Sequence, residues 1–332
     1  MIDIVKSFPW LQSSWSQLEN YRNQNRIPQA LLISGHKGLG KLQLAEHYAK
    51  ALLCSSSQSD VAFCGKCASC LLFKAETHPD YIFIEPEEVG KAIGIAVIRQ
   101  LIVKLALMPQ YEAYRVVIIN SADSLNNASA NAFLKYLEEP TERTCVVLIT
   151  ERPSRLPATI RSRCQKLKIS TPDQIVFNTG LKQLGISDNK DLLFVLSQGA
   201  PLLAKQFADT SVLKLRTDCF KNWLKLAHSE ICFVDLAEQW HKLARAEAGF
   251  LLFWLISWVV DMIKLSYHKQ PVQLYNQDLI TDLQDLVQRL DLKNVYKYYD
   301  FLLLCQHRLD TQLNKQLMFE EILIQWSRLN SR

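Results

Sequence analysis

Residues 35–43, GHKGLGKLQ, have the glycine spacing of a loop that binds phosphate groups. Glycines in such a loop let successive backbone N–H groups point at the phosphates, and a lysine reaches the terminal phosphates. An apolar run precedes the loop and a helical segment follows it, as this chemistry requires. The sequence therefore predicts a phosphate-binding loop (P-loop) built from four residues: Gly35, Gly38, Gly40 and Lys41.

The groups that would complete an ATPase site are missing. A serine or threonine normally follows the loop lysine and ligates Mg²⁺, but Leu42 has no oxygen for the metal. An acidic pair should end a nearby strand, where Asn120 and Ser121 stand instead. Asp123 lies past the strand end and is expected to point elsewhere. The pattern predicts a degenerate site that binds nucleotide weakly or stays empty.

Four cysteines form a C-x9-C-x2-C-x2-C array: Cys54, Cys64, Cys67 and Cys70. Cysteines at this spacing can place their thiolates around one tetrahedral ion, and four soft ligands leave no open coordination position. The array predicts a structural Zn²⁺ site, with an iron–sulfur cluster or ordinary free thiols as alternatives. His78 could add a fifth donor, although a capping or core role fits it better.

The remaining cysteines stand singly in apolar or helical contexts, so we expect core residues: Cys145, Cys164, Cys219, Cys232 and Cys305. Nine cysteines without a secretory signal favour a reducing compartment, and we expect a cytoplasmic protein. The net charge of +5 is compatible with nucleic-acid contact but does not argue for it. Residues 248–260 are uncharged but too short for the roughly 20 apolar residues of a membrane span, so a buried helix is expected.

The stretch RSRC, residues 161–164, follows the last predicted strand and a helical turn. An arginine presented to the nucleotide of a neighbouring subunit neutralises charge on the γ-phosphate and can accelerate hydrolysis by about 10³ to 10⁵. Two ordinary surface arginines are the simpler interpretation, and the spacing alone does not choose between them.

The elements that must position these residues alternate between strands and helices. Residues 126–140, NNASANAFLKYLEEP, have helical apolar spacing and a proline stop. After about residue 166 no convincing strand is found, and helices are expected to the end of the chain. The first part therefore predicts an α/β layer fold. Short runs rich in Val and Ile predict parallel strands covered on both faces: 30–34, 81–85, 115–120 and 144–150.

Taken in order, these motifs resemble the family of delta-prime subunits of the bacterial DNA polymerase III clamp loader, within the AAA+ proteins. The resemblance covers about residues 10–205 and rests on five stretches: RIPQALLISGHKGLGK at 26–41, the four-cysteine array, THPD at 77–80, NNASANAFLKYLEEP at 126–140, and the Ser-Arg-Cys motif at 162–164. The helical remainder agrees in length and class but carries no motif.

The resemblance implies three domains. Residues 1–166 would form an AAA+ P-loop-type domain with the zinc module, 167–207 a small helical lid domain, and 208–332 a helical collar domain for oligomerisation. It also implies a hetero-pentameric ring with gamma/tau-type ATPases and delta. Such a ring opens a sliding clamp and places it on primer-template DNA, so contacts with clamp and DNA are expected through the complex, and none with a membrane.

The resemblance implies that this subunit is not itself an ATPase. Its Arg163 would act as an arginine finger in trans, with Ser162 and Cys164 as motif neighbours. ATPase members also carry a nucleotide-sensing arginine where Leu202 stands here. No independent ATPase activity is expected, although the subunit is part of a DNA-directed DNA polymerase, the DNA polymerase III holoenzyme. The presence of Lys41 leaves residual nucleotide affinity open.

Two alternatives remain. The first is an active AAA+ ATPase subunit of the same loader, which would need other groups to hold Mg²⁺. The second is a stand-alone zinc-dependent DNA-binding protein, against which the mild charge and the lack of finger-type histidine spacing argue. The helix expected at 248–260 is apolar on nearly every face and must be buried, within its domain or against another subunit. We expect the C-terminal domain to mediate assembly.

Overall fold

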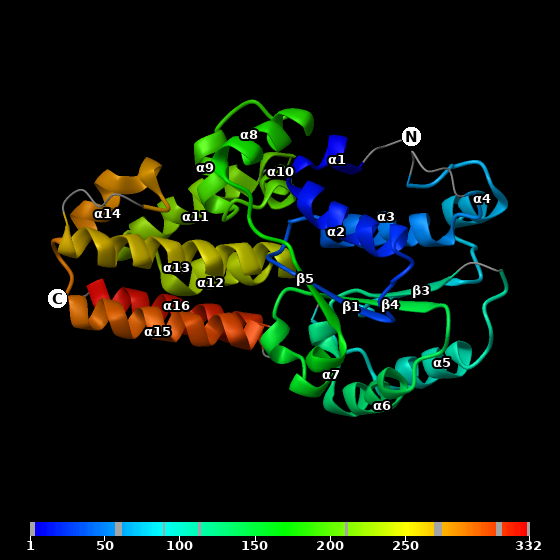
Figure 1. The fold of residues 1–332 in the computed structure, drawn as a ribbon. Coiled ribbons are helices and arrows are strands. Elements are labelled where there is room, and N and C mark those ends of the chain that lie inside the picture. The colour runs from blue at the N-terminus through cyan, green and yellow to red at the C-terminus, as the bar shows by residue number, and fades with distance from the viewer. Residues whose placement is uncertain are drawn as a thin grey trace. The chain divides into compact units, whose positions relative to one another are not determined.

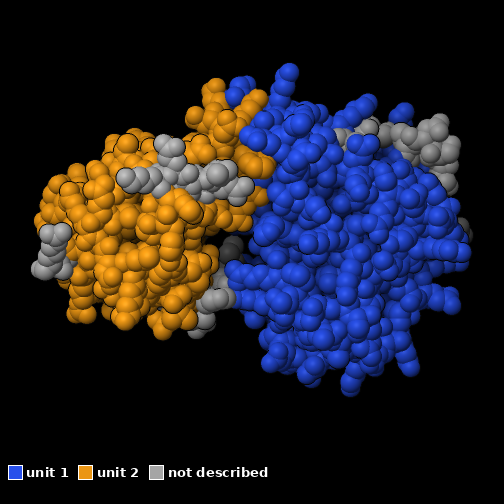
Figure 2. All heavy atoms as spheres, turned by 60° about the vertical axis from the view of Figure 1, so that its left-hand side comes forward, with its two compact units in different colours: residues 1–187, 199–203 blue, residues 188–198, 204–332 orange. Residues whose placement is uncertain are grey.

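The computed structural model describes residues 4–56, 62–88, 90–111, 114–209, 212–268, 274–309 and 314–330. The chain forms two compact units (Figure 2). Unit 1 comprises residues 1–187 and 199–203, and unit 2 comprises residues 188–198 and 204–332. The division into three domains that the resemblance implies remains a prediction.

Unit 1 is built on a parallel sheet of five strands in the order β2-β3-β4-β1-β5. The first four strands lie where the runs of Val and Ile predict them, and β2 and β3 each end one residue earlier than expected. The predicted α/β layer fold is therefore confirmed. The strands are β1 (Ala30–Ser34), β2 (Tyr81–Ile84), β3 (Arg115–Ile119), β4 (Thr144–Thr150) and β5 (Gln165–Lys168).

The fifth strand, β5, is one that the sequence analysis misses. It lies at the edge of the sheet and pairs in parallel with β1. Its sequence, QKLK, offers a single buried residue, Leu167, among exposed polar side chains. Pairing with β1, rather than an apolar run, makes this segment a strand, and local composition gives little warning of that.

Helices cover both faces of the sheet (Figure 1). Successive strand residues point to opposite faces, so Val116 and Ile118 join one apolar cluster while Val117 and Ile119 join the other. Because both faces are buried, the strands are continuous apolar runs rather than alternating ones. One face carries α1 (Ile4–Ser7), α2 (Gln12–Asn23) and α3 (Lys41–Leu53), and the other carries α5 (Ile95–Leu105), α6 (Asn127–Glu138) and α7 (Ala158–Arg163).

The described chain after β5 is helical, as predicted. Short 3-10 turns occur along the whole described chain, three before β5 and one after it: η1 (Pro9–Leu11), η2 (Ala122–Ser124), η3 (Pro153–Arg155) and η4 (Gln277–Leu279). The further helices are α4 (Ala68–Lys74), α8 (Gln174–Gln183), α9 (Lys190–Leu196), α10 (Pro201–Asp209), α11 (Val212–Ala227), α12 (Phe233–His241), α13 (Arg245–Tyr267), α14 (Ile280–Val287), α15 (Leu292–Leu309) and α16 (Lys315–Asn330).

The core of unit 2 forms around α13. By length and composition, residues 247–267 of this helix could cross a membrane, but most of the apolar stretch is buried inside the protein. Its Trp258 is fully buried beside Trp223, whose ring stacks on that of Trp326 at 3.8 Å between centroids. The buried helix predicted at 248–260 is therefore confirmed as a core helix of a helical unit.

Candidate functional site

The glycine loop connects the C-terminal end of β1 to the first residue of α3, Lys41. Gly38 and Gly40 have φ angles of 79° and 81°, which glycine adopts without the steric cost that a side chain would bring. The carboxyl ends of parallel strands are where α/β folds bind ligands, and a helix N-terminus favours anions. The local backbone therefore has the form of a phosphate-binding loop.

The side chain of Lys41 is turned back onto this loop. Its Nζ donates hydrogen bonds to the carbonyl oxygens of Gly35 at 2.9 Å and His36 at 2.7 Å, and it lies 3.8 Å from Oε1 of Glu151. The side chain is only 7% exposed. Burial lowers the pKa of Lys41, while the carboxylates of Glu151 and Asp123 act in the opposite direction. The ammonium group thus has two backbone carbonyls and one carboxylate as protein partners.

The beginning of α10 packs directly against the loop. The backbone amide of Leu202 donates a hydrogen bond to the carbonyl oxygen of Gly38 at 3.0 Å. A Cβ atom added to Gly38 would lie 2.6 Å from Cβ of Leu203, and one added to Gly40 would lie 3.7 Å from Cδ1 of Leu202. At the place where the resemblance expects a nucleotide-sensing arginine, an apolar leucine therefore lies against the loop.

The end of β3 carries no acidic pair, because Asn120 and Ser121 follow the strand. Asn120 donates from Nδ2 to Oε2 of Glu85 at 3.4 Å, and Ser121 begins a short turn with φ of 56°. Asp123 accepts a hydrogen bond from the hydroxyl of Thr150 at 2.8 Å and still acts electrostatically on the loop lysine. Leu42 packs against the apolar core. Two of the three N–H donors of the Lys41 ammonium group are bonded to loop carbonyls, and no side-chain oxygen for Mg²⁺ stands at position 42.

Arg163 lies in the last turn of α7 rather than after it. Its Nη2 donates to Oε1 of Glu138 at 2.8 Å, and its Nη1 donates to the carbonyl oxygen of Thr159 at 3.0 Å. The neighbouring Ser162 donates its hydroxyl to the same carbonyl at 3.0 Å. Cys164 is buried, and burial raises the pKa of its thiol to about 11. The structure thus presents the arginine at the surface, anchored by its own chain.

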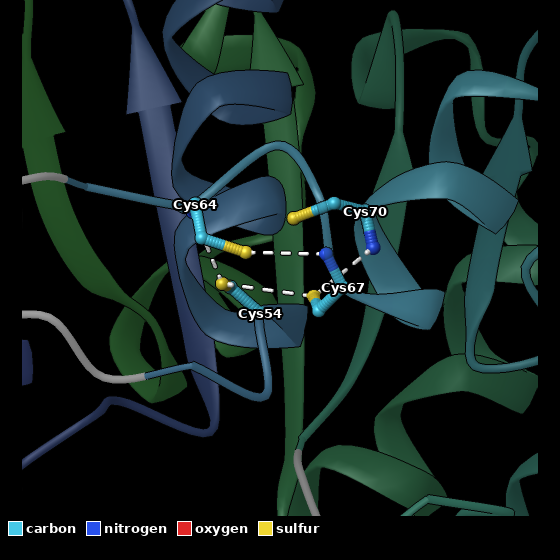
Figure 3. A group of neighbouring side chains, drawn as sticks. All are labelled: Cys54, Cys64, Cys67 and Cys70. Atoms are coloured by element: carbon cyan, nitrogen blue, oxygen red, sulfur yellow. Dashed lines mark hydrogen bonds between the residues drawn. The ribbon is translucent and has the colours of Figure 1, made fainter.

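The structure brings the four cysteines of the array together (Figure 3). Their sulfur atoms all lie within 4.8 Å of one another. Cys54 follows α3, and Cys67 caps the N-terminus of α4 by accepting from the amide of Cys70 at 3.5 Å. The sulfur of Cys64 accepts from the amides of Lys66 at 3.4 Å and Cys67 at 3.3 Å. Four converging sulfurs with amide donors are a donor set that could hold a metal ion such as zinc.

Proton affinities differ within this cluster. Burial acts to raise the pKa of Cys67, but hydrogen bonds from Ser55 and Cys70 outweigh it and hold the pKa at about 6. Amide hydrogen bonds also lower the pKa of Cys64, whereas burial raises the pKa of Cys54 and of Cys70. Metal binding requires thiolates, and the amide donors supply part of that stabilisation.

The other candidate donors lie apart from the cluster. His78 is buried, and its Nδ1 accepts from the amide of Asp80 at 3.1 Å, which is the capping role that the sequence favours. The expectation of core cysteines is wrong for Cys232, which is exposed just before α12, because a cysteine at a helix start need not face the core. The remaining single cysteines are buried as expected: Cys145, Cys164, Cys219 and Cys305.

A buried ion pair in unit 1 escapes the sequence analysis. Arg115, the first residue of β3, donates from Nη2 to Oδ1 of Asp80 at 3.4 Å, and both side chains are almost fully buried. The carboxylate also accepts from the amides of Gln110 and Tyr111, each at 3.0 Å. Asp80 directly precedes β2 and Arg115 begins β3, and these two strands are neighbours in the sheet. The positions of an acid and a base at the starts of two predicted strands could have suggested the pair.

Two family models match this sequence. One, described as DNA polymerase III, delta subunit, matches residues 10–173, and another, described as DNA polymerase III, delta subunit, C terminal, matches residues 211–328. The chain is similar to the DNA polymerase III subunit delta' of Pseudomonas aeruginosa, with 33% identity over 97% of this chain and 98% of that protein. The proteins of the same description from Yersinia pestis and Escherichia coli are 30% and 28% identical, each over 96% of this chain and 95% of theirs.

Proposed function

Because this chain belongs to the family of DNA polymerase III delta-prime subunits, which are clamp-loader subunits, we propose that it is a scaffold subunit that does not hydrolyse ATP. In this proposal its Arg163 acts as an arginine finger that completes the nucleotide site of an adjacent ATPase subunit. It is then part of a DNA-directed DNA polymerase holoenzyme without an ATPase activity of its own.

The hydrogen bonds and burial of Lys41 are the observation that supports the first part of the proposal, that this chain does not hydrolyse ATP. Its ammonium group is buried and bound to two carbonyl oxygens of its own loop. Leu42 supplies no oxygen to Mg²⁺, and Asn120 supplies no charge. Leu202 occupies the other side of the loop. Hydrolysis needs a bound metal and a positioned water, and these residues support neither.

The surface position of Arg163 supports the second part of the proposal, that this arginine reaches the nucleotide of an adjacent subunit. Its helix, α7, packs on the sheet face opposite to α3, the helix that follows the chain's own glycine loop. A guanidinium has five N–H donors in a planar fork, and Glu138 and Thr159 engage only two groups of it. With 36% of the side chain exposed, donors remain for a phosphate that another chain brings.

We propose Zn²⁺ as the ion of the four-cysteine cluster, with a structural role. Four sulfur ligands would fill a tetrahedral shell and leave no position for water or substrate. When bound, the ion would supply a cross-link between the end of α3 and the start of α4. Arg22 of α2 reaches the same region, where its Nη1 donates to the carbonyl oxygen of Ala62 at 2.6 Å. The ion would therefore hold this loop in place beside α2 and α3 within unit 1.

The proposed partners follow from the family. We propose a hetero-pentameric ring with gamma/tau-type ATPases and delta in the cytoplasm, in which the helical C-terminal region mediates assembly. Contacts with the sliding clamp and with primer-template DNA would be made by the complex. Phosphate contacts of this kind are salt-dependent, so binding of the loader to DNA should weaken as the salt concentration rises.

The ATPase rate of the reconstituted loader, stimulated by primed DNA and clamp, tests the proposal. Arg163→Ala should reduce turnover at the adjacent site by on the order of 10³ while assembly, followed by size-exclusion chromatography, stays intact. Lys168→Ala, which removes an exposed cation at the end of β5, should leave the rate unchanged and is the control. An unchanged rate with Arg163→Ala would exclude the finger role and would make Lys41 the next residue to examine.

A further inference from the structure

The side chain of Arg163 is held by an acid from a different helix. Glu138 is the last residue of α6, and Arg163 is the last residue of α7. Their ion pair joins Nη2 to Oε1 at 2.8 Å, the usual length of a charge-assisted hydrogen bond, and the two side chains are 36% and 54% exposed. The carbonyl oxygen of Thr159 takes a second N–H group at 3.0 Å. The guanidinium is therefore fixed from two directions.

This arrangement adds little to the stability of the fold. Exposed ion pairs are screened by water, and ordering two long side chains costs entropy. Orientation is a different matter, since a guanidinium recognises phosphate through the direction of its planar fork. A group that completes a site in another subunit must be held near its working geometry before the nucleotide arrives, because misplacement of a catalytic group by about 1 Å can cost 10²-fold in rate.

We propose that Glu138 is the positioning residue for Arg163. Its carboxylate holds the guanidinium against the end of α7, so that the N–H groups not bound by Glu138 and Thr159 face the γ-phosphate of a neighbouring subunit's nucleotide. This inference rests on the proposed function of Arg163. It assigns to Glu138, at the end of α6, a role in orientation only, in which its carboxylate contacts neither the nucleotide nor the attacking water.

The steady-state ATPase rate of the reconstituted loader, with primed DNA and clamp, tests the role of Glu138. Glu138→Ala should lower kcat about two- to fivefold, the range expected for loss of an exposed ion pair, with KM for ATP and assembly unchanged. Glu138→Gln keeps an acceptor oxygen and should retain most of the rate. The matched control is Glu139→Ala, which removes the adjacent exposed carboxylate and should have no effect.

A double variant separates orientation from a general effect of charge. In the Arg163→Ala background, Glu138→Ala should cause no further loss, because the group that it orients is gone. A further loss in the double variant would show that Glu138 acts independently and would overturn the inference. The thermal unfolding midpoint of each variant, measured on the same preparations, should stay at the wild-type value.

The outcomes distinguish this inference from the proposal beneath it. If Arg163→Ala lowers the rate while Glu138→Ala leaves kcat unchanged or raises it, the finger role stands and the positioning role is overturned. A raised kcat would mean that the carboxylate restrains the arginine instead of orienting it. If Arg163→Ala has no effect, the proposed function fails first, and the role of Glu138 fails with it.

Discussion

The backbone amide of Leu202 donates a hydrogen bond to the carbonyl oxygen of Gly38 at 3.0 Å. This bond ties the start of α10 to the middle of the glycine loop, and Leu203 follows with its own backbone against the same glycine. A nucleotide phosphate in such a loop is recognised by N–H groups of the loop and by its lysine. Here the lysine donates to loop carbonyls, and the backbone and Cβ of Leu203 lie against the glycine.

The close approach at Gly38 predicts an unusually damaging alanine substitution. Gly38 and Gly185 have φ angles of 79° and 81°, so alanine is strained equally at both positions. Only at Gly38 would the new Cβ meet other atoms, 2.6 Å from both Cβ and N of Leu203, whereas Gly185 has open space. We expect Gly185→Ala to cost about 1–2 kcal/mol in unfolding free energy and Gly38→Ala about 1–3 kcal/mol more.

Denaturant unfolding of both variants, monitored by circular dichroism, checks this prediction. Gly185→Ala is the matched control, since it carries the backbone strain without the steric contact. Equal losses for the two variants would show that α10 does not press on the loop in solution, and the covered state of the loop would then have to be abandoned.

Much of unit 1 could be predicted from the sequence because its strands are covered on both faces. That environment demands continuous runs such as residues 115–120 and 144–150, which few other structures tolerate. β5 could not be predicted, since QKLK becomes a strand only by pairing with β1. The strand depends on a contact with residues distant in sequence, and its own residues do not indicate a strand.

In the candidate sites, too, some features can be predicted from the sequence and others depend on contacts that the sequence does not indicate. Ligand spacing alone placed Cys54 with the three later cysteines, because a metal shell fixes both residue type and separation. The partners of Lys41 could not be foreseen, since they are backbone carbonyls, which every residue carries. The Glu138–Arg163 pair was equally hidden, because nothing in LEEP or RSRC indicates that the ends of α6 and α7 adjoin.

We predict that the four-cysteine cluster binds a metal ion and that a single substitution abolishes this binding. Purified wild-type protein should contain about one Zn²⁺ per chain, and Cys67→Ser should contain almost none, because a structural site needs its full ligand set. A strong chelator should lower the thermal midpoint of the wild-type protein but not that of the variant. Elemental analysis and thermal unfolding measure both effects.

Cys232→Ser is the matched control for the metal prediction. This cysteine is exposed and stands outside the cluster, so its replacement should leave the zinc content unchanged. Iron in place of zinc would favour the cluster alternative, and full zinc content in Cys67→Ser would contradict the assignment of that residue as a ligand.

The buried pair of Asp80 and Arg115 predicts a large cost for removing one partner. Arg115 also donates to the carbonyl oxygens of Leu107 at 2.7 Å and Met108 at 2.8 Å, so the pair anchors the segment after α5. Asp80→Ala would leave a buried cation without its counter-charge, and we expect a loss of about 3–5 kcal/mol. Glu85→Ala, at the exposed end of β2, should change stability little.

Hydrogen exchange gives the Asp80 prediction a local test. The amides of Gln110 and Tyr111 donate to this carboxylate, so both should lose protection in Asp80→Ala beyond the global change. Retained protection at these two amides would show that another group holds the segment.

The buried carboxylate of Asp261 in unit 2 predicts a pH-dependent stability. It accepts hydrogen bonds from the amides of Tyr275 at 3.0 Å and Asn276 at 2.7 Å, and from Nδ2 of Asn276 at 2.8 Å. Burial raises its pKa above the ordinary value of 3.8, although these bonds and Lys264 act to lower it. The folded state therefore binds a proton more tightly than the unfolded state. This contribution to stability is present below the unfolded pKa and is lost as pH rises through the folded pKa.

Asp261→Asn removes this titration while keeping the side-chain shape. The new amide nitrogen would face N–H groups whose hydrogen bonds the carboxylate accepts in the wild-type protein. We therefore expect the free energy of unfolding to fall by about 1–3 kcal/mol at pH 7. Because the wild-type protein gains stability on acidification and the variant does not gain it at this position, the gap between them should widen as pH falls from 7 to 4. Asp285→Asn, at an exposed position of α14, controls for the change in net charge. A gap that narrows toward pH 4 would mean that hydrogen bonding outweighs burial at Asp261 and that its folded pKa lies below the ordinary value.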